Sequence, residues 1–389
     1  MAASDCKHFT GYKPCGKSSL CDELCPSYFK PQISILIIHL GALGAVVRST
    51  SLLKAIKRKY PSSIVTWVTD APADRLLQNH PLIDRVMTSA EKDLLQLAAV
   101  EFDIAYVIDK SLKAVGVLKK TTVDQVYGFT ADPKTGAILP ATEAARELWL
   151  LGLNNHQKFF VNQKPETQLM VEALELGPWL RDDYFLPLST SEELAKVERR
   201  DDWSHQGCKI LVGLNTGCSS VIAHKKLSIE MHRRVIQNLT FNSNIQIVLL
   251  GGPEDTERNS VIAQGLPVIN TNTESGLRDG LVSVAACDVV LTGDSLGMHM
   301  AISQKKYVVA WFGPTCAQEI DLYDRGSKIL APVTCSPCWK RDCSRAQMCY
   351  DQVSEQEIIQ AIQKGIEFVR ESHSSNSLPG RSTAEYPAF

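Results

Sequence analysis

Apolar runs and amphipathic stretches alternate along most of this chain. The first apolar run, residues 33–40, is followed by a glycine-containing turn and then by an amphipathic stretch at residues 46–59. This order is typical of a strand and helix in a parallel sheet, whose central strands are buried on both faces. Because similar units recur as far as residue 312, the pattern predicts a doubly wound α/β architecture.

Two such series follow one another. The predicted strands are residues 33–40, 62–68, 85–87, 102–108 and 123–128, then 209–214, 246–250, 268–270, 288–292 and 307–312. The predicted helices are residues 46–59, 70–80, 165–182, 191–201, 228–239, 255–264, 276–286, 298–304 and 354–370. Two α/β halves in tandem predict two domains with a cleft between them, lined by the turns at the carboxyl ends of the strands.

The predicted organisation has four parts. They are a Cys-rich segment at residues 1–30, an N-terminal domain at 31–165, a C-terminal domain at 166–371, and a Ser-rich, Pro-containing disordered tail at 372–389. The glycines at 41 and 44 are three residues apart and do not form the G-x-G-x-x-G dinucleotide fingerprint.

Size and charge narrow the function class. The 389 residues are 44% hydrophobic with a net charge of −2, which argues against a generic nucleic-acid binder. The first residues lack the apolar core of a signal peptide, and no window reaches the apolar length of a transmembrane helix. We therefore expect a cytoplasmic protein of two domains.

Eight of the 12 cysteines fall into two groups. In a reducing compartment, grouped cysteines favour metal binding over disulfides. The first group has irregular spacing, C-x8-C-x5-C-x3-C, and leaves metal ligands and reduced surface thiols equally open: Cys6, Cys15, Cys21 and Cys25. The second group, C-x2-C-x4-C-x5-C, can satisfy a tetrahedral structural ion and favours metal over free thiols: Cys335, Cys338, Cys343 and Cys349.

The stretch at residues 291–300 combines a strand end, a Gly-Asp-Ser turn and the start of a helix. Free N–H groups and the helix dipole make such a turn an anion site, and His299 lies on its first helical turn. The alternative is an ordinary strand–helix connection in which Ser295 caps the helix.

Several ordered segments resemble the ADP-heptose heptosyltransferases of glycosyltransferase family 9. They are residues 35–58, 215–225, 249–254, 292–299 and 312–315, within a likeness from about residue 31 to 365. The resemblance implies a GT-B fold, with two Rossmann-like domains that face each other across a cleft. The N-terminal domain would bind the acceptor and the C-terminal domain the nucleotide sugar.

The resemblance also implies a donor site. Thr216 and Gly217 would hold the donor diphosphate, and Lys225 would stabilise the leaving phosphate without a metal, with Lys226 as the alternative cation. Glu254 would contact the nucleoside. The most recognisable motif would meet the diphosphate and sugar through Asp294, Ser295, Gly297 and His299.

One position departs from the family pattern. Ala45 stands where these enzymes usually carry the aspartate that acts as general base. Either another carboxylate substitutes, or the substitution was introduced deliberately, or the protein no longer catalyses transfer. Asp109, at the end of a buried strand, is the best substitute, and a structural cap of the next helix is its alternative.

The leading hypothesis is inverting, metal-independent transfer of heptose from ADP-heptose to lipopolysaccharide inner core or to a protein serine or threonine. The alternatives are a catalytically impaired donor-binding scaffold and a transferase for another nucleotide sugar. The second cysteine group resembles a finger that binds iron in relatives that glycosylate autotransporters, and zinc is chemically as reasonable. Peripheral membrane contact through the basic run at residues 54–59 and a homo-oligomer stay open.

Overall fold

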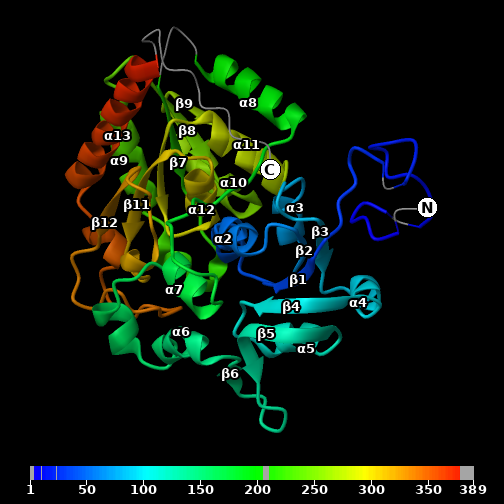
Figure 1. Ribbon diagram of the computed structural model, residues 1–389. Helices are drawn as coiled ribbons and strands as arrows, with labels where there is room; N and C mark the ends of the chain where they lie inside the picture. The colour runs from blue at the N-terminus through cyan, green and yellow to red at the C-terminus, as the bar shows by residue number, and fades with distance from the viewer. Residues whose placement is uncertain (1–3, 10, 23, 205–209, 377–389) are drawn as a thin grey trace. The chain divides into compact units, whose positions relative to one another are not determined.

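The computed structural model describes residues 4–9, 11–22, 24–204 and 210–376. Its contacts divide the chain into two compact units (Figure 1). The first runs to Pro187 and also contains Gln318–Asp321, and the second comprises Leu188–Ala317 and the chain from Leu322 onward. The first unit thus includes residues 166–187, which the sequence analysis assigns to the C-terminal domain.

The first unit is built on a six-stranded sheet of order β3-β2-β1-β4-β5-β6. Its first five strands are parallel, and only the short β6 is antiparallel. The strands are β1 (Ile33–Ile38), β2 (Ser63–Thr69), β3 (Arg85–Thr88), β4 (Glu101–Val107), β5 (Thr122–Ala131) and β6 (Ile138–Pro140). The helices are α1 (Leu43–Ser49), α2 (Leu52–Lys59), α3 (Ala73–Leu76), α4 (Glu91–Leu97), α5 (Leu112–Leu118), α6 (Arg146–Leu151) and α7 (Glu166–Ala173).

Helices cover both faces of this sheet. Ile35 and Ile37 of β1 pack in a cluster with residues of α1, α2, α6 and α7. The alternate residues, Leu36 and Ile38, pack in a second cluster with residues of α4 and α5. Burial on both faces explains why β1 is a continuous apolar run rather than an alternating one.

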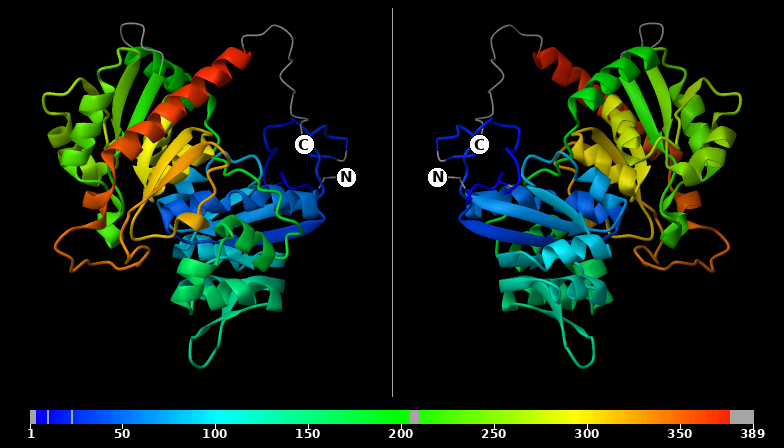
Figure 2. Two further views of the ribbon diagram at one scale, coloured as in Figure 1. Left: turned by 90° about the vertical axis from the view of Figure 1, so that its left-hand side faces the viewer. Right: turned by 90° about the vertical axis from the view of Figure 1, so that its right-hand side faces the viewer.

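The second unit has a wholly parallel sheet of order β12-β11-β10-β7-β8-β9. Its strands are β7 (Ile210–Asn215), β8 (Ile245–Leu250), β9 (Val268–Asn270), β10 (Val289–Gly293), β11 (Tyr307–Phe312) and β12 (Gly326–Leu330). Its helices are α8 (Thr190–Trp203), α9 (Ile229–Leu239), α10 (Thr256–Ala263), α11 (Leu277–Ala286), α12 (Leu296–Ser303) and α13 (Glu355–Asn376). Helix α13 lies along this sheet (Figure 2) and buries Ile358 and Ile362 in the unit's core. The two doubly wound α/β units confirm the predicted fold class.

Three predicted helices are shorter or broken, and the one predicted at 70–80 is reduced to α3 (Ala73–Leu76). The helix predicted at 46–59 is divided into α1 and α2, because the hydroxyls of Thr50 and Ser51 donate to the carbonyls of Val47 and Arg48 at 2.6 and 2.9 Å. The helix predicted at 165–182 ends as α7 at Ala173, ahead of Glu175 and Gly177, which both have positive φ.

Three further regions bear on the sequence predictions. The N-terminal segment is mostly irregular, and Lys7 joins it to the rest of the first unit through an ion pair with Asp84 at 2.9 Å. Helix α13 reaches Asn376, so it includes the first residues of the predicted tail, whose remainder at 377–389 lies outside the described residues. No helix in the described part of the chain is long and apolar enough to span a bilayer.

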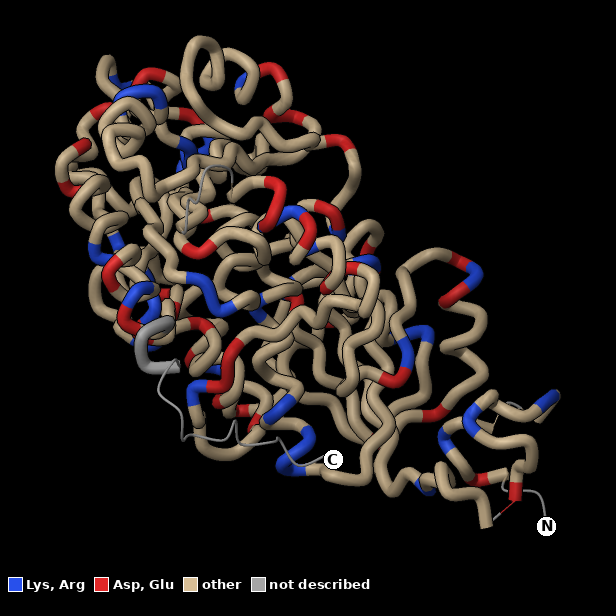
Figure 3. Tube along the Cα trace, turned by 90° about the horizontal axis from the view of Figure 1, so that it is seen from above, with Lys and Arg blue, Asp and Glu red and all other residues tan. Residues whose placement is uncertain are grey.

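Charges of both signs are interspersed along the trace (Figure 3). In the basic run of α2, Lys57 donates to the carbonyl of Ser63 at 2.8 Å, and Lys59 donates to that of Glu175 at 2.6 Å. Arg58 forms a bidentate pair with Asp182 at 2.6 and 2.8 Å. Most of the basic side chains in this run therefore make hydrogen bonds or ion pairs within the first unit.

Candidate functional site

The expected donor residues gather at one edge of the second sheet. Strands β10, β7 and β8 are neighbours and parallel, so the turns that follow them lie at the same carboxyl edge. These turns carry Thr216 and Gly217 after β7, Glu254 after β8, and Asp294 and Ser295 after β10. Ligands of parallel α/β sheets bind at such an edge.

Asn215 ties two of these turns together. Its side-chain amide donates to Ser295 Oγ at 2.9 Å, to Thr292 Oγ1 at 3.1 Å and to the carbonyl of Gly217 at 3.2 Å. The Ser295 hydroxyl is thus held by side chains, and it makes no capping hydrogen bond to α12. The first N–H groups of α12 have no side-chain cap, which is the arrangement an anion site requires.

Lys225 supplies a cation beside this helix start. Its Nζ lies 3.6 Å from Asp294 Oδ2, and both side chains are 17% exposed. His299 Nε2 lies 3.9 Å from the other oxygen of Asp294. The backbone of Lys225 also approaches this turn closely, since a Cβ at Gly293 would lie 1.9 Å from the carbonyl oxygen of Lys225.

Two glycines allow a close approach at the same edge. A Cβ at Gly297 would lie 2.5 Å from Asn215 Cγ, and a Cβ at Gly217 would lie 1.7 Å from Asp255 Oδ2. Asp255 accepts a hydrogen bond from the N–H of Gly252 at 3.0 Å, and burial raises the pKa of its carboxyl. No side chain larger than hydrogen fits at either position without displacing its neighbour.

The other expected donor residues differ in exposure. Thr216 is fully buried, and its hydroxyl donates to Asn259 Oδ1. Its N–H donates to the carbonyl of Leu250 at 3.2 Å, and its own carbonyl accepts from Arg258 Nε at 3.1 Å. Glu254 is exposed on the turn after β8, and Lys226 is partly exposed next to Lys225. Asn215 and Asp255 were not singled out from the sequence, although Asn215 opens the Asn-Thr-Gly segment.

Asp109 lies at the corresponding edge of the first sheet. It follows β4, which pairs with β1, and its Oδ2 accepts from the N–H of Leu40 just before the glycine turn. Its Oδ1 lies 3.8 Å from His39 Nε2. Burial raises the pKa of Asp109 to about 6, with Asp70 adding to the rise and backbone N–H groups opposing it. A carboxyl of this kind can accept a proton near neutral pH.

A charge cluster lies near Ala45 in the same unit. Arg48, one turn after Ala45 on α1, pairs with Glu166 at 2.6 Å, and Lys158 pairs with Glu319 at 3.4 Å. Burial, with the nearby charge of Glu166, raises the pKa of Glu319 to about 7.

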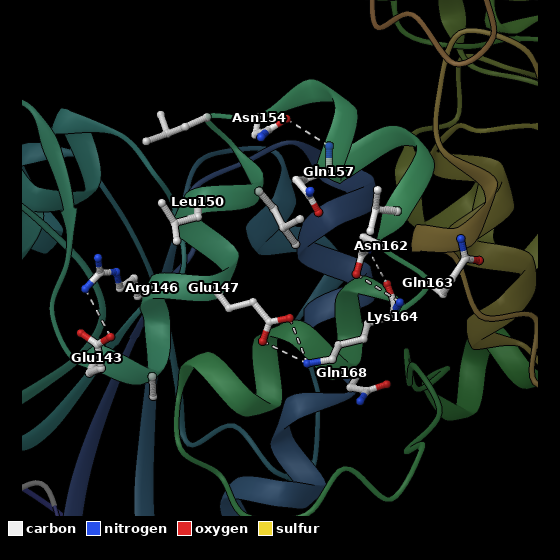
Figure 4. Close-up of a pocket in the computed structure, with 14 residues that line it drawn as sticks. Glu143, Arg146, Glu147, Leu150, Asn154, Gln157, Asn162, Gln163, Lys164 and Gln168 are labelled. Atoms are coloured by element: carbon white, nitrogen blue, oxygen red, sulfur yellow. Dashed lines mark hydrogen bonds and ion pairs between the residues drawn. The ribbon is translucent and has the colours of Figure 1, made fainter.

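The first unit also contains a broad hollow, bordered by α6, the π-helix η2 (Gln157–Val161) and the start of α7 (Figure 4). Leu150 and Val161 line it and are 45% and 50% exposed. Lys164 spans it to Glu147 at 3.0 Å, and Arg146 pairs with Glu143 at 3.4 Å. Both cations that line the hollow are therefore paired within it.

The C-terminal cysteine group lies in the irregular segment between β12 and α13, drawn in orange in Figure 2. Cys335, Cys338, Cys343 and Cys349 line one small cavity. In this structure the four thiols are not close enough together to hold a metal ion. Among the described residues, no group of three or more His, Cys, Asp or Glu is arranged to do so. The same finding covers the described N-terminal cysteines.

A family model and the named relatives indicate one family. The family model "Glycosyltransferase family 9 (heptosyltransferase)" matches residues 94–349. Lipopolysaccharide heptosyltransferase 2 of Salmonella typhimurium is 23% identical over 300 residues, which cover 73% of this chain and 83% of that protein. Its counterpart in Escherichia coli is 22% identical over 303 residues, with the same coverage of both chains.

Solved structures share the fold. A family 9 glycosyl transferase from Veillonella parvula superposes with a TM-score of 0.69 at 17% identity, over 87% of this chain and 98% of that one. E. coli ADP-heptose lps heptosyltransferase II has a TM-score of 0.64 at 19% identity, over 88% and 100% of the two chains. The dodecameric iron-containing heptosyltransferase TibC has a TM-score of 0.51 at 10% identity, over 90% and 80%.

The family match thus extends over the greater part of the chain, from α4 of the first unit to the last cysteine of the C-terminal group, and it includes Asp109 and every expected donor residue. This protein belongs to glycosyltransferase family 9, the heptosyltransferases.

Proposed function

We propose that this protein transfers a heptose from ADP-heptose to an acceptor hydroxyl, with inversion and without a metal ion at the reacting centre. The proposal rests on one observation: Lys225, Asp294 and the uncapped start of α12 lie together at one edge of the second sheet. A cation and a helix N-terminus side by side suit a diphosphate leaving group. Named relatives support heptose as the sugar.

The donor would lie along the turns of the second sheet. The backbone of Gly217, next to the buried Thr216, and the first turn of α12 would hold the diphosphate, while Glu254 would meet the nucleoside from the turn after β8. Asp294 lies beside Lys225 and faces His299, so it orients the ammonium of Lys225 and the imidazole of His299 toward the ligand rather than contacting phosphate itself. Like charge makes a direct carboxylate–phosphate contact unfavourable.

Asp109 would act as the general base. In the transfer step the acceptor O–H proton passes to Asp109 as the oxygen bonds to the anomeric carbon. The bond from that carbon to the diphosphate breaks at the same time, and the electron pair leaves with ADP, whose new charge Lys225 stabilises. Attack opposite to the leaving group inverts the configuration. Ala45 takes no part in this chemistry.

The acceptor is either a sugar hydroxyl of lipopolysaccharide core or a serine or threonine of a protein. The names of the relatives in Salmonella typhimurium and E. coli favour lipopolysaccharide. A homo-oligomer stays a prediction, for which the dodecameric TibC is a precedent within the shared fold.

The C-terminal cysteines would hold a structural iron or zinc ion. The donor set fits, because four thiols line one cavity and thiolates are the preferred ligands of both ions in tetrahedral sites. Cys335, Cys338, Cys343 and Cys349 would bind it after losing their protons, and the ion would stabilise the segment that joins β12 to α13. No transfer step passes through it.

Turnover tests the proposal directly. The protein is incubated with ADP-heptose and with core lipopolysaccharide or Ser/Thr peptides, and ADP release and product mass are followed. We expect ADP release that depends on acceptor, with less than a tenth of the rate from ADP-glucose or UDP-glucose.

The competing function, a donor-binding scaffold, predicts ADP-heptose binding without turnover. Restoring the usual carboxylate with Ala45→Asp separates the two. No turnover by either form, with binding intact, would favour the scaffold.

A further inference from the structure

The C-terminal cysteine segment, residues 335–349, contacts the loop that carries Lys225. The cavity lined by Cys335, Cys338, Cys343 and Cys349 is also lined by His224 and Gly313. His224 directly precedes Lys225 and is 8% exposed. A residue of the expected donor loop thus forms part of the wall of the thiol cavity.

Close contacts attach this segment to the turn after β11. A Cβ at Gly313 would lie 2.7 Å from Cys349 Sγ, and Ser336 Oγ donates to the carbonyl of Gly313 at 2.5 Å. The N–H groups of Cys338 and Trp339 both donate to the carbonyl of Pro314, at 3.1 and 2.8 Å. There is little free space between the thiols and the sheet edge.

Further contacts connect His224 with the sheet edge that carries the expected donor residues. The carbonyl of Lys225 lies against Gly293, where a Cβ would come within 1.9 Å of it, and Lys225 Nζ lies 3.6 Å from Asp294. Because His224 is bonded directly to Lys225, and the carbonyl of Lys225 is in close contact with Gly293, we expect a displacement of His224 to move Lys225 and the turn that begins α12.

Binding a metal ion would change this cavity. A tetrahedral ion needs each sulfur at about 2.3 Å, whereas the described thiols share the cavity without forming a ready site. Cys343 is exposed and the other three are only partly buried, so ligation has to draw the thiols together. This contraction acts on the residues that line the same wall, His224 and Gly313.

We propose that the cysteine segment and the Lys225 loop form one coupled element, in which a thiophilic divalent ion bound by the cysteines sets the position of Lys225 through His224 and so the affinity for the donor diphosphate. His224 is a positioning residue here and not a ligand of the nucleotide. The inference rests on the proposed function at one point, the role of Lys225 in holding the diphosphate.

The test measures two affinities on the full-length, reduced protein. The Kd of ADP is measured by calorimetry without metal and with one equivalent of Zn²⁺, and the Kd of Co²⁺ is measured from its thiolate absorption with and without ADP. We expect metal to change the ADP affinity at least about fivefold, and ADP to change the Co²⁺ affinity by the same factor, because coupling between two sites is reciprocal.

Three variants test whether the coupling between the metal and ADP passes through His224. His224→Ala should retain the Co²⁺–thiolate spectrum and ADP binding but lose the mutual dependence. Lys340→Ala, an exposed change on the same segment, should behave as the parent protein. Cys338→Ser should abolish tight Co²⁺ binding and hold the ADP affinity at its metal-free value. Thermal unfolding of each variant shows that it is folded.

The outcomes separate the two proposals. If the ADP affinity is equal with and without bound metal, the proposed coupling is wrong. The coupling is also wrong if the protein binds no metal. Neither result contradicts the proposed function. Coupling that persists in His224→Ala overturns the assigned route. If ADP binds in neither state, the proposed function fails at its donor site.

Discussion

At the residue scale, the base is the central question, because Ala45 cannot accept a proton. Asp109 has the properties that a substitute needs: a place at the carboxyl end of a central strand, partial exposure, and a pKa raised to about 6 by burial. A buried helix cap does not explain its position, since Ser111 caps α5 through the N–H of Ala114.

Replacing Asp109 with asparagine should reduce kcat by about 10²–10⁴-fold, the usual contribution of a general base. In the parent protein kcat/KM should rise with pH through about 6, since the carboxylate form is required and its pKa is raised to that value. The variant should lose this rise while its Kd for ADP stays unchanged. Initial rates from pH 5 to 8 and calorimetry measure both; an unchanged rate would show that Asp109 is not the base.

Lys225 should matter more to the reaction than to the fold. Lys225→Gln removes the charge that stabilises the leaving diphosphate in the proposed mechanism, and losses of about 10²–10³-fold in kcat are typical when one such group is removed. ADP affinity should fall as well. Lys226→Gln is the matched control, because it changes the adjacent cation. If Lys226→Gln has the larger effect, the two roles are reversed.

At the scale of elements, the start of α12 depends on a close approach between two turns. Gly297→Ala would place a Cβ 2.5 Å from Asn215 Cγ and displace the amide that holds Ser295. We expect ADP affinity to fall about tenfold, the effect of a loss of about 1.4 kcal/mol, with the unit still folded. Gly280→Ala on α11 meets no atom within 4 Å and should leave binding unchanged. Calorimetry on both variants decides whether this contact matters.

The regular elements were largely predictable because their signals are local. β1 and β11 follow from apolar runs, and the glycine turn after β8 follows from its residues. The break at Thr50 was not predictable, since it depends on which way two hydroxyls turn. Asn215 was missed for a related reason: its role depends on Ser295, which is brought to it only by strand order.

At the scale of the whole molecule, buried neutral histidines occur in both units. Burial lowers the pKa of His39 to about 3, and it lowers that of His80 and His232 to about 4. The unfolded chain binds protons at these side chains near pH 6.5, well before the native state does. Their contribution to stability is therefore complete above pH 6.5 and is lost as pH falls toward 4.

Acidification from pH 7 to 4.5 should lower the free energy of unfolding by on the order of several kcal/mol. Asp109 and Glu319 oppose this loss of stability. Their raised pKa values of about 6 and 7 mean that the native state binds their protons at higher pH than the unfolded chain does. These two carboxyls offset only part of the effect of the three histidines. Urea unfolding at several pH values measures the slope. His232→Gln should flatten it for the second unit, because the neutral amide does not titrate, whereas His156→Gln at an exposed position should not. A stability that rises on acidification would show that the carboxylates dominate and that these histidines are not held neutral.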